Sequence, residues 1–105
     1  MAARLTRTDR IHRLVAKTRR RVDKIPEGTR LLRHMPNSML GVLVREAGYE
    51  RSSRKLLEEL ARRFRDEGVD FSPELGDPAN TPKTRIYFFD VERPVKGLQP
   101  PRQLF

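Results

Sequence analysis

The first apolar pattern along the chain runs from Thr8 to Ile25 and has the period of an amphipathic helix. At about 100° per residue its members fall in one narrow sector. They are Ile11, Leu14, Val15, Thr18, Val22 and Ile25. Arginine and lysine spread over the other side, and Thr8 is a candidate N-cap. We expect the apolar stripe to pack on the rest of the domain or on a second copy of the chain.

A second helix, a turn and a third helix are predicted between Pro36 and Gly68. The second opens at residues 36–38, and its apolar face consists of Met39, Leu40, Leu43 and Ala47. The third runs from about residue 52 to 67, and its apolar stripe consists of Leu56, Leu57, Leu60 and Phe64. Residues 29–35, which precede this pair, fit either a helix or a short strand.

The turn between these helices contains Gly48, which can adopt the positive φ that ends a helix. Ser52 or Ser53 can then cap the next helix through its hydroxyl. Two helices joined by a short glycine-containing turn are typical of the helix-turn-helix motif.

Two strands complete the predicted fold. Residues 69–72 look extended, and Pro73 limits them to a short edge strand. Residues 84–91 form the strongest strand pattern in the chain, and the intervening loop is rich in glycine and proline. A β-hairpin is therefore expected. Prolines argue against regular structure over residues 93–105, where Leu104 and Phe105 either fold back on the domain or dock a partner.

Positive charge is concentrated at the beginning of the chain. The net charge is +9, and residues 1–35 hold 11 Lys/Arg and 3 Asp/Glu, which gives +8. Such asymmetry favours an anionic partner, first of all nucleic acid, because neutralising phosphates releases counterions. An arginine-rich but otherwise ordinary soluble protein is the alternative. The predicted phosphate-clamping residues are Arg7, Arg10, Arg13, Lys17, Arg20 and Arg21.

The order helix, short extended piece, helix, turn, helix and hairpin resembles the winged helix-turn-helix family over roughly residues 26–91. The resemblance rests on Gly48-Tyr49, the leucine stripe, Gly68 and the strand 85–90. The phrase Gly48-Tyr49-Glu50-Arg51 and the later Phe71-Ser72-Pro73 also resemble small winged-helix domains of bacterial restriction and mobile-element proteins. The expected fold is α+β: a basic N-terminal helix (1–25), a winged-helix domain (26–93) with a three-helix core and a hairpin, and a tail (94–105).

The family resemblance implies that the third helix reads duplex DNA and that the hairpin loop contacts the backbone. The residues concerned are Arg51, Ser52, Arg54, Lys55, Arg62, Lys83 and Arg85. Glu50, Glu58 and Glu59 lie near the same face, and many winged helices use it for protein contacts. An RNA- or ribonucleoprotein-binding protein, a protein-interaction adaptor and a homodimer therefore stay open beside transcription regulation.

Candidate enzymatic chemistry is sparse. The chain has no cysteine, and His12 and His34 are isolated, so no metal-ligand spacing is present. The Ser52-Ser53 pair has no nearby histidine, and no phosphate-binding glycine loop occurs. We predict a non-enzymatic protein with no cofactor and no metal. Without an apolar run of about 20 residues or a signal peptide, we expect it to be cytoplasmic and not membrane-bound.

Overall fold

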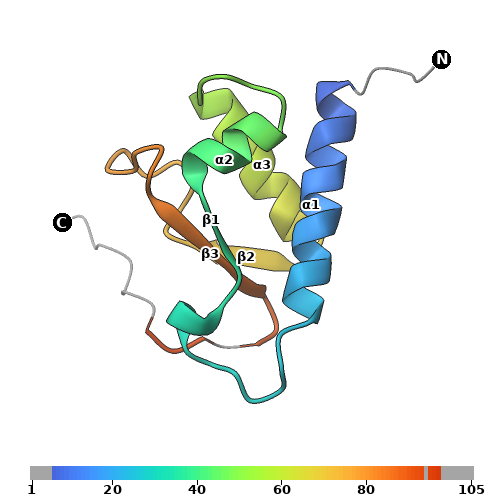
Figure 1. The fold of residues 1–105 in the computed structure, drawn as a ribbon, viewed down its shortest axis with the longest axis vertical. Coiled ribbons are helices and arrows are strands. Elements are labelled where there is room, and N and C mark those ends of the chain that lie inside the picture. The colour runs from blue at the N-terminus through green and yellow to red at the C-terminus, as the bar shows by residue number, and fades with distance from the viewer. Residues whose placement is uncertain (1–5, 94, 98–105) are drawn as a thin grey trace.

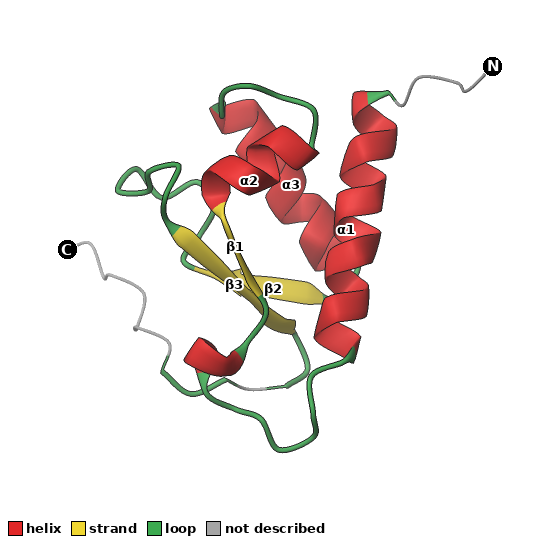
Figure 2. Cartoon of the chain, in the orientation of Figure 1, coloured by secondary structure: helices red, strands yellow, loops and turns green. Residues whose placement is uncertain are grey.

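The computed structural model describes residues 6–93 and 95–97 and has an α+β fold. Within this part of the chain, three α-helices lie against one three-stranded antiparallel sheet (Figures 1 and 2). The elements are α1 (Arg7–Asp23), the 3-10 turn η1 (Leu32–His34), β1 (Asn37–Met39), α2 (Leu40–Glu46), α3 (Arg54–Asp66), β2 (Val69–Ser72) and β3 (Arg85–Asp90). The strand order is β1-β3-β2.

The N-cap of helix α1 lies two residues before the predicted one. Thr6 accepts a hydrogen bond from the backbone N–H of Asp9 at 3.1 Å, and the Asp9 carboxylate accepts one from the N–H of Thr6 at 3.2 Å. This reciprocal capping box satisfies two otherwise unpaired donors. Thr6, and not Thr8, therefore caps α1.

The apolar stripe of α1 packs on the rest of the described chain. Its residues Ile11, Leu14, Val15 and Val22 belong to the same buried cluster as the stripes of α2 and α3 and the inner side chains of the sheet. The predicted Thr18 position on this stripe is confirmed, because Thr18 is buried and its hydroxyl donates to the Leu14 carbonyl at 2.8 Å. The basic N-terminal helix is thus one of the three helices around this core, and not an addition to a three-helix core.

The predicted helix opening at residues 36–38 is wrong, because these residues lead into and form β1. Asn37 pairs with Tyr87, and Ser38 pairs with Ile86. Helix α2 starts only at Leu40, whose N–H donates to the Thr84 carbonyl at 2.9 Å. The next N–H, from Gly41, donates to the Pro82 carbonyl at 2.8 Å. Carbonyls that precede β3 therefore cap α2, and this tertiary partner has no local signal in the sequence.

The predicted turn and hairpin are confirmed. Gly48 has a φ of +90°, and Ser53 caps α3 by accepting from the N–H of Leu56 at 3.1 Å. Strands β2 and β3 pair antiparallel, with Phe71 opposite Phe88. The ambiguous residues 29–35 contain η1, and Leu31 forms a parallel bridge with Lys96.

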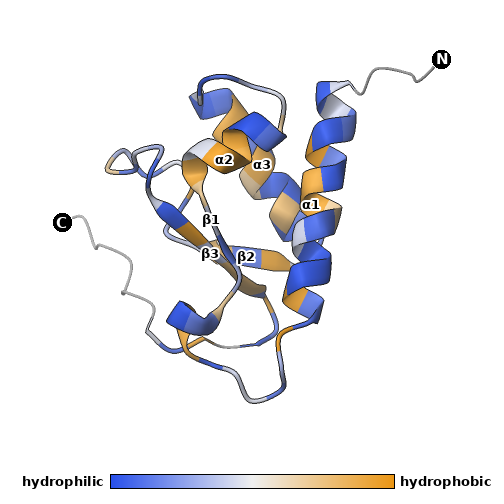
Figure 3. Ribbon diagram, in the orientation of Figure 1, coloured by the Kyte–Doolittle hydropathy of each residue, from blue (hydrophilic) through white to orange (hydrophobic). Residues whose placement is uncertain are grey.

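The centre of the core is aromatic. The ring of Phe64 on α3 lies 5.0 Å from that of Phe88 and 6.1 Å from that of Phe71, between ring centroids. Leu75 is also fully buried, although it belongs to the loop that was predicted from its glycine and proline content. Figure 3 shows apolar stretches alternating with polar ones along α1 and α3, as expected of helices with one buried side. The predicted Leu104-Phe105 contact lies outside the described residues.

Candidate nucleic-acid interface

The first turn of α3 and the residues just before it are open to solvent. Arg51, Ser52, Arg54 and Lys55 are all exposed. Arg54 pairs with Glu58 at 3.0 Å, but the two side chains are 93% and 66% exposed. An ion pair this exposed contributes little free energy and exchanges readily for another anion. The predicted reading residues are therefore accessible.

The α2–α3 turn lies against the first turn of α1 (Figure 1). The Arg7 guanidinium stands 4.4 Å from the centre of the Tyr49 ring, a cation–π distance. A Cβ added to Gly48 would approach the Cδ of Arg10 to 2.8 Å. Arg7 and Arg10 of α1 therefore lie against the turn that leads into α3, and both helices begin at the same end of the molecule (Figure 1).

The hairpin loop, residues 73–84, folds back toward α2. The Asn80 side-chain amide donates to the carbonyls of Glu74 and Leu75, at 2.7 and 3.3 Å. A cleft of about 390 Å³ remains between this loop, α2 and the α2–α3 turn. Its lining includes Arg51 and Ser52 from the turn and Asn80, Thr81 and Pro82 from the loop.

Of the two predicted loop residues, Lys83 is exposed and directly follows Pro82, which lines the cleft. Arg85 is also exposed, but it is the first residue of β3 and not part of the loop; it donates to the Asn37 side chain at 2.8 Å, so it is oriented by β1. Arg62 lies two turns further along α3, about 12 Å from Arg54. There it shares a shallow groove with Glu58, Glu74 and Asp77, and the site changes from cationic to mixed charge.

Most of the predicted phosphate-clamping residues of α1 are exposed, but Arg21 is not among them. Arg10, Arg13, Lys17 and Arg20 lie on its outer side, and Lys17 pairs with Glu46 of α2 at 3.2 Å. The guanidinium of Arg21 is half-buried and donates to the Ser38 hydroxyl at 3.2 Å and to the Asn37 carbonyl at 3.1 Å. Arg21 thus attaches β1 to α1, a role that the sequence prediction missed.

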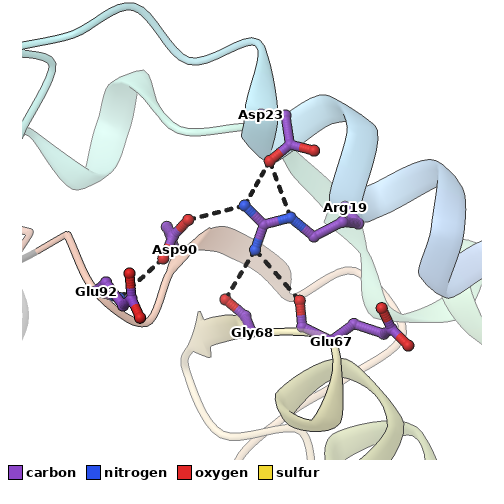
Figure 4. Close-up of polar contacts among 6 residues, drawn as sticks. All are labelled: Arg19, Asp23, Glu67, Gly68, Asp90 and Glu92. Atoms are coloured by element: carbon purple, nitrogen blue, oxygen red, sulfur yellow. Dashed lines mark hydrogen bonds and ion pairs between the residues drawn. The ribbon is translucent and has the colours of Figure 1, made fainter.

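Arg19 was not predicted, yet it makes the densest polar network of the described residues (Figure 4). It donates to the Asp23 and Asp90 carboxylates and to the carbonyls of Glu67 and Gly68. These bonds, first of all those to Asp23 and then to Asp90, raise the pKa of the guanidinium. Only the i,i+4 spacing to Asp23 was visible in the sequence.

Other chemistry is limited in the described part of the chain. Residues 6–93 and 95–97 hold no group of three or more His, Asp or Glu side chains placed to bind a metal ion. None of the helices in that part combines the length and apolar character needed to cross a membrane. Phe88 and Phe89 are buried and Tyr87 is partly covered, so β3 presents no open aromatic platform.

Comparison with protein-family models, curated proteins and solved structures finds no match for this chain.

Proposed function

We propose that this protein binds duplex DNA through the end of the molecule formed by the start of α3, the α2–α3 turn and the first turn of α1. The observation that carries the proposal is that exposed cations of two elements lie at this end of the molecule, around the α2–α3 turn. They are Arg7 and Arg10 of α1 and Arg51, Arg54 and Lys55 around the start of α3. Because α3 presents its N-terminus, free backbone N–H groups and the helix dipole add to this positive potential.

The order of the elements supports a winged helix-turn-helix assignment. A helix, a short strand, two helices around the Gly48 turn and a hairpin follow one another, and β1 joins the hairpin's sheet. The hairpin loop and the end of the α2–α3 turn flank one cleft, in the places that a wing and the approach to a reading helix would occupy. An α-helix fits the major groove, where arginine and lysine donate to guanine edges.

The buried aromatics favour DNA over RNA. Single-stranded RNA is usually recognised by bases that stack on exposed aromatic rings. Here Phe64, Phe71 and Phe88 form the core, and Tyr49 is already stacked by Arg7. A cationic surface without stacking rings suits the phosphates and groove edges of a duplex.

The direct test removes the three cations at the start of α3. In fluorescence anisotropy with a duplex, Arg51→Gln/Arg54→Gln/Lys55→Gln should weaken binding on the order of a hundredfold at 0.1 M salt, and the slope of log K against log salt should fall by about 2.7. The relative affinities for duplexes of different base sequence should also change.

A matched control is Arg30→Gln/Arg33→Gln/Lys96→Gln, which removes the same charge from exposed positions. They belong to the segments around η1 and after β3, at the opposite end in Figure 1. It should lose much less affinity. Equal losses of affinity in the two variants would show that net charge alone drives binding, and would overturn the proposed site. Tighter binding to structured RNA than to duplex DNA would favour the ribonucleoprotein alternative.

A further inference from the structure

Helix α1 and its C-cap residue carry a row of exposed cations, which we call the α1 row: Arg10, Arg13, Lys17, Arg20 and Lys24. The spacing of three and four residues places them along one side of the helix, over about 21 Å. Among the described residues, the one carboxylate that pairs with the row is Glu46, at 3.2 Å from Lys17. A shallow groove of about 280 Å³ between Arg10, Arg13, Leu14, Lys17 and Glu46 follows this side.

The α1 row lies on a different side of α1 from α3. Lys17 reaches Glu46 at the end of α2, whereas Arg19 reaches the Glu67 and Gly68 carbonyls at the end of α3. Lys17 and Arg19 are two positions apart in sequence, which corresponds to a rotation of about 200° around the helix axis. Their contacts therefore lie on opposite sides of α1. Figure 4 shows the Arg19 side directed at the α3–β2 turn. The row therefore faces away from α3.

A duplex bound at the start of α3 meets the row only at its N-terminal end, where Arg10 lies beside Gly48. The remaining members continue down the flank toward the end of α1, away from the α2–α3 turn (Figure 1). Lys24, the last member, lies about 21 Å along the helix from Arg10, on the side of α1 that faces away from α3.

We propose that the α1 row binds the phosphate backbone of a second DNA duplex, so that one chain bridges two duplexes. This inference rests on the proposed function, because the first duplex occupies the α3 site. Duplex DNA carries about one negative charge per 1.7 Å of axis, so a row of about 21 Å spans roughly six base pairs. No base contact is involved, and this second site is independent of sequence. Glu46 competes with phosphate for Lys17.

The buried face of α1 decides against a membrane as the partner. An interfacial helix inserts its apolar side into lipid. In α1 that side is committed to the core, with Ile11 and Val22 only 2% and 1% exposed. Only the charged side chains of α1 are therefore available to an anionic partner.

A bridging experiment with the full chain tests the proposal. One duplex is immobilised, a second is fluorescent, and capture of the second is measured as protein is added. The wild type should capture it. The variant Arg13→Gln/Arg20→Gln/Lys24→Gln should lose most capture while its affinity for a single duplex in anisotropy changes less than about threefold, since the α3 site is intact. The variant Arg30→Gln/Arg33→Gln/Lys96→Gln should still capture, and Glu46→Gln should increase capture.

Several results would overturn the bridging model. Single-duplex binding without any capture by the wild type would remove the second site and leave the proposed function standing. Capture carried by two chains in mass photometry would assign bridging to a dimer. If the row variant lost single-duplex affinity to the same extent as it lost capture, the two sites would be one site. Equal binding of the row to anionic phosphatidylserine vesicles would make its partner a membrane surface. Absence of any DNA binding by the wild type would overturn both proposals.

Discussion

At the scale of single residues, Arg19 and Asp90 connect parts of the fold that are distant in sequence. The Arg19 guanidinium lies 2.8 Å from the Asp90 carboxylate on β3 and 3.1 Å from the Gly68 carbonyl after α3. Carbonyls at the end of a helix have no partner within the helix, and Arg19 supplies one. Its function is structural, although its residue type and helix resemble those of the DNA-binding candidates.

This network predicts an acid-sensitive contribution to stability. The hydrogen bond from Arg19, and then that from the Glu92 N–H, lower the pKa of the Asp90 carboxyl below its ordinary value of 3.8. The contribution is therefore fully present above the unfolded-state pKa and is lost as pH falls through the lower folded-state pKa. Asp90→Asn should reduce the free energy of unfolding by about 1 to 2 kcal/mol at pH 7.

Denaturant unfolding at a series of pH values checks this. The difference between wild type and Asp90→Asn should shrink below pH 3.8. In an Arg19→Gln background the same substitution should have little effect at any pH. A difference that stays constant from neutral to acidic pH would contradict an ionic role for Asp90.

At the scale of elements, α1 and α3 were predictable because their buried residues repeat with the helical period. The stripe Leu56, Leu60 and Phe64 is buried as predicted. Strand β1 was not predictable, because its three residues are extended only through pairing with β3, far along the chain. Leu75 was missed for a similar reason, since its burial depends on how a loop folds over the core.

The α2–α3 turn depends on the conformation of Gly48. Its φ of +90° is costly for any residue with a side chain, and a Cβ would also displace Arg10. Gly48→Ala should lower the free energy of unfolding by about 1 to 2 kcal/mol. Chemical denaturation measures it, with Gly76→Ala as control, because Gly76 has no positive φ and a Cβ there meets nothing within 4 Å. Equal effects of the two substitutions would contradict this account of the turn.

At the scale of the whole molecule, the core includes α1. Burying an aliphatic side chain contributes about 1.5 to 3 kcal/mol, and four from α1 together rival the total stability of a small protein. A chain beginning at residue 26 should therefore not fold, although the family resemblance placed the domain boundary there. Far-UV circular dichroism and amide chemical-shift dispersion provide the measurement. A 26–105 fragment with dispersed amide shifts and cooperative unfolding would show that α1 is dispensable.

The candidate site could be predicted in composition but not in arrangement. Arginine and lysine at the start of α3 were visible as charges before an apolar stripe. Which α1 cations face solvent depends on neighbours from β1, α2 and the end of α3, and these are set by the tertiary fold. Arg13 and Arg21 have the same side chain on the same helix, yet one is exposed and the other holds β1.

Arg19 also limits how the protein can respond to a ligand. Because one guanidinium joins α1, the α3–β2 turn and β3, none of these can swing outward without breaking bonds to the other two. The protein should then bind the proposed duplex as a rigid body, with any adjustment made by the DNA or by side chains at the protein surface.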